Sequence, residues 1–172
     1  MSNFLSDYEV KISRQFEDKG FLIKDIEDLH SLNKLRDVLI KNHLKINKIK
    51  KNTSTNEEIL NSTHKKIRPN NLNQFRLNII NEINKNKDVR VLYYKISKPI
   101  LDIILGNELS MQSRINLSIQ LPMDNSSLLP VHSDVWSGDS PFETVVWLPL
   151  VDCYKTKSMF ILPPKKYNKI KK

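Results

Sequence analysis

The sequence is poor in cysteine and in long apolar runs, and each shortage argues against a class of protein. Cys153 is the only cysteine, so no disulfide can form within the chain, which favours a reducing cytoplasm. No apolar run approaches the roughly 20 residues that a membrane-spanning helix needs. The first residues lack a basic segment followed by an apolar one, so we expect neither a signal peptide nor a membrane partner.

Basic charge is concentrated in the middle of the chain. The formal net charge is +9, and residues 31–103 hold 16 Lys and Arg against 6 Asp and Glu, whereas residues 104–164 hold 3 against 6. We interpret the basic excess as a solvated surface and expect no nucleic-acid partner. The alternative is a basic module that binds nucleic acid or another anionic surface, and salt-sensitive binding to random DNA would favour it.

Residues 1–106 are expected to be mainly helical. Apolar residues recur every three or four positions from Leu29 to Leu39, with Asp28 as the N-cap, so most of residues 28–41 should form a helix. Similar stripes predict that most of residues 72–105 is helical, ending at Gly106. The apolar stripes are interpreted as core, and residues 21–23 as one short strand.

The pattern changes after Gly106 to apolar residues at every second position. In residues 112–121, four aliphatic side chains alternate with Arg114, Asn116, Ser118 and Gln120, which is typical of a strand with one polar face. Residues 142–151 and 158–162 have the composition of further strands. Helices followed by successive strands predict one α+β domain over residues 1–172, with a largely antiparallel sheet.

His132 and Asp134 form a His-x-Asp motif between the first two of these predicted strands. Two residues apart in an extended segment, their side chains point to the same face. One imidazole and one carboxylate are two of the three ligands in the facial triad that holds non-haem iron(II). The motif alone is common, and the alternative is a turn in which Asp134 caps a backbone amide and His132 lies at the surface.

A longer stretch carries a family resemblance. The run LPVHSDVWSGDSPFETVVWLPLVDCYKTKSMFILPP resembles iron(II)/2-oxoglutarate-dependent oxygenases, in particular a subfamily of sporadic bacterial carbohydrate-biosynthesis clusters. The N-terminal run QFEDKGFLIKDIEDLHSLNKLR resembles the opening of phytanoyl-hydroxylase-like relatives. The implied fold has N-terminal helices packed on a partial jelly-roll (double-stranded β-helix) core, of which residues 107–164 would supply the first strands.

The resemblance also implies roles for individual residues. His132 and Asp134 would bind iron(II), while Arg114, Asn116, Gln120 and Trp136 would face 2-oxoglutarate or the substrate. The alternative interpretation of the three polar side chains is that they are simply exposed to solvent. The alternative for Trp136 is that it packs beside the metal-binding loop. The implied activity is a hydroxylase or oxidase that acts on a carbohydrate or nucleotide-sugar precursor of a surface polysaccharide.

The chain departs from the family on the C-terminal side of the motif. No histidine occurs after His132, so the distal histidine ligand and the nearby arginine that binds 2-oxoglutarate are not identified. The upstream histidines His30, His43 and His64 are interpreted as surface residues. We therefore expect a C-terminally truncated chain with weak iron binding, partnered by a second copy or a complementing C-terminal chain. The alternative is a non-catalytic remnant or subunit of the same fold.

Overall fold

The computed structural model describes residues 4–50, 54–125 and 127–170, and its regular elements are helical. The α-helices are α1 (Asp7–Lys19), α2 (Leu29–Ile46), α3 (Asn56–Asn61), α4 (Pro69–Lys85) and α5 (Lys87–Leu105). Four short 3₁₀ helices are η1 (Thr63–Lys65), η2 (Asp134–Ser137), η3 (Lys155–Lys157) and η4 (Pro164–Ile170). The helices predicted over residues 28–41 and 72–105 are thereby confirmed.

Local sequence signals account for the helix ends. The carboxylate of Asp28 accepts a hydrogen bond from the amide of Ser31, at 2.9 Å, so it is the N-cap of α2 that the sequence predicts. Ser6 starts α1 with a capping box, in which its side chain and that of Glu9 each satisfy the other's backbone amide. At the other end of the helical region, α5 stops at Gly106, whose φ of 85° favours glycine.

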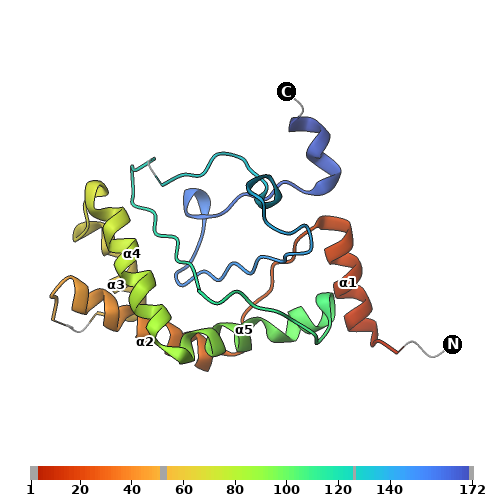
Figure 1. The fold of residues 1–172 in the computed structure, drawn as a ribbon, viewed down its shortest axis with the longest axis horizontal. Coiled ribbons are helices and arrows are strands. Elements are labelled where there is room, and N and C mark those ends of the chain that lie inside the picture. The colour runs from red at the N-terminus through yellow and green to blue at the C-terminus, as the bar shows by residue number, and fades with distance from the viewer. Residues whose placement is uncertain (1–3, 51–53, 126, 171–172) are drawn as a thin grey trace.

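The helices form one side of the molecule. In Figure 1, α2 to α5 occupy the left and lower edges, α1 closes the right-hand side, and the irregular residues 107–163 lie above them. α2 packs against α3, α4 and α5, and α1 packs against α5. The buried core is built by apolar residues of α2, α4 and α5, by one residue just before α4, and by two residues from the irregular part: Leu35, Leu39, Ile67, Leu72, Phe75, Ile79, Ile83, Val89, Ile115 and Leu121.

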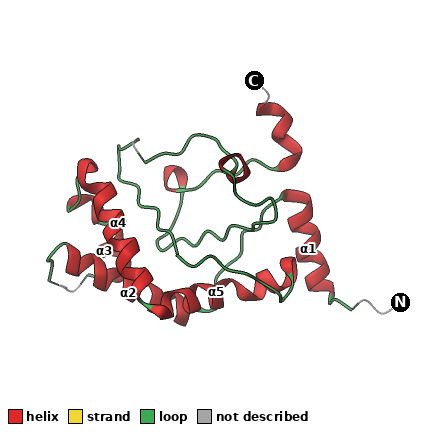
Figure 2. Cartoon of the chain, in the orientation of Figure 1, coloured by secondary structure: helices red, strands yellow, loops and turns green. Residues whose placement is uncertain are grey.

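The predicted α+β fold with a partial jelly-roll core is wrong for this structure. None of the described residues forms a β-strand, and Figure 2 shows helices and loops only. The segments predicted as strands, namely 21–23, 112–121, 142–151 and 158–162, have neither helical nor sheet structure. Residues 107–163 are therefore an irregular part of a helical protein, and the short 3₁₀ helices η2 and η3 are its regular elements.

The period-two pattern of residues 112–121 nevertheless describes its burial correctly. Ile115 and Leu121 are buried against the helices, whereas the alternating polar side chains are exposed. A strand needs a neighbouring backbone as its hydrogen-bonding partner. Here the side chain of Asn84 on α4 takes that role, because it accepts from the amide of Ile115 at 2.8 Å and donates to the carbonyl at 2.9 Å. The segment thus packs with alternating faces without joining a sheet.

Residues 142–151 are held in a similar way. Thr144, Val146 and Leu148 are partly buried, and Val145 and Trp147 between them are exposed. The Tyr93 hydroxyl on α5 donates to the Val146 carbonyl. Arg36 Nε on α2 donates to the carbonyl of residue 150, at 3.0 Å. Helix side chains therefore anchor both segments that the sequence predicted as the principal strands.

Candidate metal-binding residues

Local backbone structure places the side chains of the His-x-Asp motif on one side. Ser133 is extended, with φ −124° and ψ 137°, so its two neighbours point the same way. Asp134 then begins η2, which is closed by a hydrogen bond from the Trp136 amide to the Ser133 carbonyl. Gly138 ends the turn with a φ of 99°, in the left-handed region that favours glycine.

His132 and Asp134 converge as the sequence predicts. His132 Nε2 lies 3.6 Å from Asp134 Oδ1, which is too long for a direct hydrogen bond. His132 Nδ1 lies 2.7 Å from the carbonyl oxygen of Pro130. That contact favours the tautomer in which Nδ1 carries the proton and donates it, which leaves the Nε2 lone pair facing the carboxylate. In that tautomer Nε2 and Oδ1 are both available as metal ligands and lie on the same side of the backbone.

The two residues fit part of an iron site. Two ligand atoms at right angles around one ion, each about 2.1 Å away, lie about 3.0 Å apart, so a small approach of the side chains would suffice. Both side chains are about half exposed. Within the described part of the chain, no group of three or more His, Cys, Asp and Glu residues is placed to hold a metal. The donor chemistry suits iron(II), but a three-residue facial triad is not assembled, and we derive no catalytic step from it.

The residues predicted to face the cosubstrate do not gather around this pair. Arg114 Nη2 donates to Asn81 Oδ1 on α4, at 2.7 Å, and its side chain lines a shallow hollow there. Asn116 and Gln120 are exposed. Trp136 follows the motif directly, and it is 71% exposed, so it does not pack into the core. No hydrogen bond or ion pair between described residues links any of these side chains to the pair.

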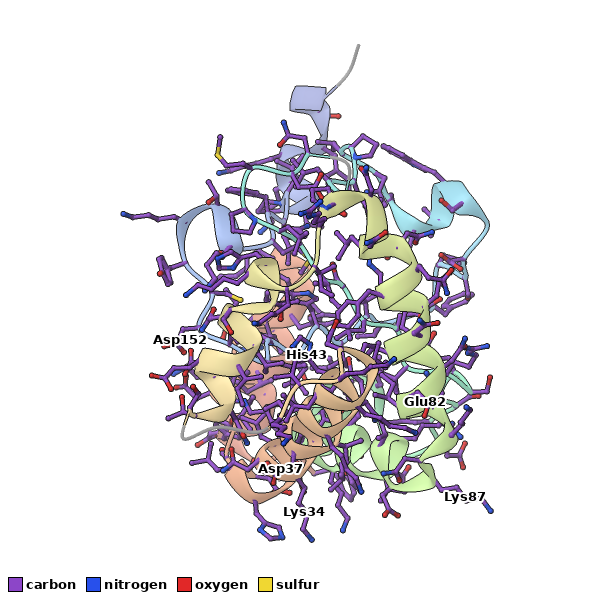
Figure 3. The ribbon with its side chains drawn as sticks, turned by 90° about the vertical axis from the view of Figure 1, so that its left-hand side faces the viewer. Lys34, Asp37, His43, Glu82, Lys87 and Asp152 are labelled. Carbon is purple, nitrogen blue, oxygen red and sulfur yellow. The ribbon has the colours of Figure 1, made fainter. Side chains whose placement is uncertain are left out.

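Of the three upstream histidines, one was placed wrongly by sequence reasoning. His30 and His64 are exposed, as predicted. His43, however, is buried within the helical layer of Figure 3, where its ring meets Phe75 edge-on with centroids 5.5 Å apart. Burial lowers the pKa of His43 below its usual value of 6.5, since desolvation disfavours the imidazolium ion. His43 lies four residues after Leu39, on the apolar stripe of the helix, and this position predicts that it is buried.

Sequence reasoning also missed a groove of about 380 Å³ between α2 and α4. Val38 and the side chains of Lys41, Lys45, Glu82 and Lys85 are among its lining residues. Glu82 Oε2 lies 3.6 Å from Lys45 Nζ, and its Oε1 lies 2.5 Å from Lys85 Nζ. These cations lower the pKa of Glu82, with Lys85 contributing most. Lys41 and Lys45 are one helical turn apart, so the sequence already places their side chains on the same face of the helix.

Comparisons with known proteins identify no family for the chain. No protein-family description, no curated protein sequence and no solved structure matches it. Among the residues that the structure describes, no helix has both the length and the apolar character that crossing a membrane requires.

Proposed function

We propose that this chain supplies two ligands, His132 and Asp134, to the iron(II) centre of a 2-oxoglutarate-dependent dioxygenase. The supporting observation is their convergence, with Nε2 and Oδ1 3.6 Å apart and Nδ1 engaged by the Pro130 carbonyl. A backbone carbonyl on the far nitrogen is a common way to orient a metal-binding imidazole. The oxygenase class, and a carbohydrate or nucleotide-sugar precursor as substrate, rest on the resemblance of the sequence around the motif.

The third ligand and the cationic partner of 2-oxoglutarate are proposed to come from a complementing chain. When bound, iron(II) would supply the site for dioxygen activation. His132 and Asp134 would hold the ion, and the exposed setting of both would leave it open to cosubstrate and to water.

The test is an anaerobic titration of the 172-residue chain with iron(II), with and without 2-oxoglutarate, followed by the charge-transfer absorption of the ternary complex. We expect weak binding, with little succinate formed when oxygen is admitted, because two ligands hold a metal less firmly than three. Replacing one of two ligands, as in Asp134→Ala, should weaken iron binding at least tenfold, which corresponds to about 1.4 kcal/mol.

Asp139→Ala is the matched control, because Asp139 is a nearby exposed carboxylate with no ion pair to a described residue. It should leave iron binding unchanged. If His132→Ala and Asp134→Ala both bind iron(II) as the unmodified chain does, the proposed site is wrong. The chain is then better explained as a non-catalytic protein.

A further inference from the structure

A short turn after η2 presents an aromatic side chain to solvent between two carboxylates. Phe142 is 92% exposed, and Asp139 and Glu143 lie on either side of it in the sequence. The turn is fixed by hydrogen bonds, because the Glu143 amide donates to the Ser140 carbonyl at 3.0 Å and the Phe142 amide donates to Ser140 Oγ at 3.2 Å. We call residues 139–143 the acidic turn. A turn whose backbone is already ordered loses less freedom on binding than a flexible one.

The stretch of sequence that contains the acidic turn carries charge of one sign. Residues 115–154 contain five acidic residues (Asp124, Asp134, Asp139, Glu143 and Asp152) and no lysine or arginine, in a chain of net charge +9. Neither Asp139 nor Glu143 forms an ion pair with a described residue. The acidic turn therefore fits a partner surface that is basic at its rim and apolar at its centre.

The chain itself carries a surface of that kind on its helical side. The groove between α2 and α4, which we call the lysine groove, has Val38 and the lysine stems as its apolar wall, and Figure 3 views the molecule from this side. Its three lysines and Glu82 leave a charge of +2, which the two carboxylates of the acidic turn would balance. Lys41 has no ion pair with any described residue, so a carboxylate can bind it without breaking one.

We propose that the acidic turn of one copy of this chain docks into the lysine groove of a second copy. Phe142 enters against Val38, while Asp139 and Glu143 pair with Lys41 and its neighbours. Because the turn and the groove are different surfaces, the contact is heterologous. Each copy contains one acidic turn and one lysine groove. This self-association is independent of the proposed iron site, since it uses neither His132 nor Asp134.

The experiment is sedimentation velocity over a range of protein concentrations and salt. The unmodified chain should self-associate, and more weakly at high salt, because ion pairs at the rim are screened. Phe142→Ser should raise the dissociation constant at least tenfold, as loss of a buried aromatic anchor does. Phe160→Ser is the matched control, since Phe160 is 88% exposed but is flanked by Met159 and Ile161 instead of carboxylates. It should change nothing.

A charge-reversed pair distinguishes this contact from general stickiness. Glu143→Lys damages only the turn and Lys41→Glu damages only the groove, so each variant alone should be largely monomeric. An equimolar mixture should associate again, because the intact turn of the second variant meets the intact groove of the first. Glu17→Lys, an exposed charge reversal on α1, is the control, and unchanged circular dichroism checks the fold.

Three results would overturn the proposal. The first is an unmodified chain that stays monomeric at every concentration. The second is equal weakening by Phe142→Ser and Phe160→Ser. The third is a mixture of the two charge-reversed variants that does not associate.

Discussion

Position 43 holds an ionisable ring within the apolar contacts of α2, and its titration should be visible in the stability of the protein. Burial lowers the pKa of His43 in the folded chain, whereas the unfolded chain keeps the usual value of 6.5. The unfolded state therefore binds the proton more readily. The resulting stability is present above pH 6.5 and is lost as the pH falls from 6.5 towards the lowered pKa.

Urea unfolding at a series of pH values measures this effect. Below pH 6.5, the free energy of unfolding should fall by up to about 1.4 kcal/mol per pH unit, the limit for one proton. His43→Gln should remove this dependence, whatever it costs at higher pH. The lowered carboxyl pKa values of Glu9, Asp18 and Asp28 act in a more acidic range, so they do not mask it. Equal pH dependence in the two proteins would rule out His43 as the source.

Gly20 is the second residue whose replacement has a defined cost. Its φ of 73° ends α1 in the left-handed region, where a side chain costs about 1–2 kcal/mol. An added Cβ would also lie 2.8 Å from both Cγ and Cδ of Pro164, which begins η4. Gly20→Ala should therefore destabilise the protein by more than about 1 kcal/mol in urea unfolding.

A double-mutant cycle separates the two parts of the Gly20 effect. Pro164→Ala removes the ring that the new Cβ meets, so it should recover part of the loss when combined with Gly20→Ala. The backbone strain at position 20 remains in both backgrounds. Strictly additive effects of the two substitutions would mean that the ring moves away without cost.

Asn84 links the helical elements to the first irregular segment. Its amide makes two hydrogen bonds with the backbone of Ile115, which is buried. Asn84→Ala removes the partner of that amide and that carbonyl, and a buried polar group left without its partner costs about 1–3 kcal/mol. We expect a loss of roughly 2–4 kcal/mol in urea unfolding. Asn78→Ala, which removes an exposed hydrogen bond to Gln74, should cost less than about 0.5 kcal/mol.

The same element shows why the sequence predicts burial better than secondary structure. The alternation around Ile115 correctly predicts which side chains face the core, because burial follows the apolar pattern. Whether an alternating segment becomes a strand depends on a second backbone beside it, and no local pattern shows that this place is taken by Asn84. The amphipathic helices were predictable because each helix satisfies its own backbone.

The candidate metal site also has one part that the sequence predicts and one part that it does not. The convergence of His132 and Asp134 follows from one extended residue between them, which is local and was predicted. The position of Arg114 depends on its contact with Asn81, 33 residues earlier in the chain. Contacts between residues so far apart in the sequence depend on the tertiary fold. The motif alone therefore could not show whether polar side chains gather around the pair.

At the scale of the whole molecule, the two structural parts share one core. Ile115 and Leu121 of the irregular part pack with residues of α2, α4 and α5, and helix side chains bind both principal segments of residues 107–163. We therefore expect helical and irregular parts to unfold in a single cooperative transition. A separate early transition of the irregular part would show that the shared core is too small to couple them.

The two tryptophans of the chain can report whether the irregular part unfolds together with the helices. These residues, Trp136 and Trp147, both lie in the irregular part and are 71% and 44% exposed, while the α-helices contain none. Native emission should therefore already lie towards the long wavelengths of hydrated indole. Far-ultraviolet circular dichroism reports mainly on α1 to α5, so the two signals monitor different parts of the protein without any added label. Fluorescence quenching by iodide would then be sensitive to anything that covers the irregular part.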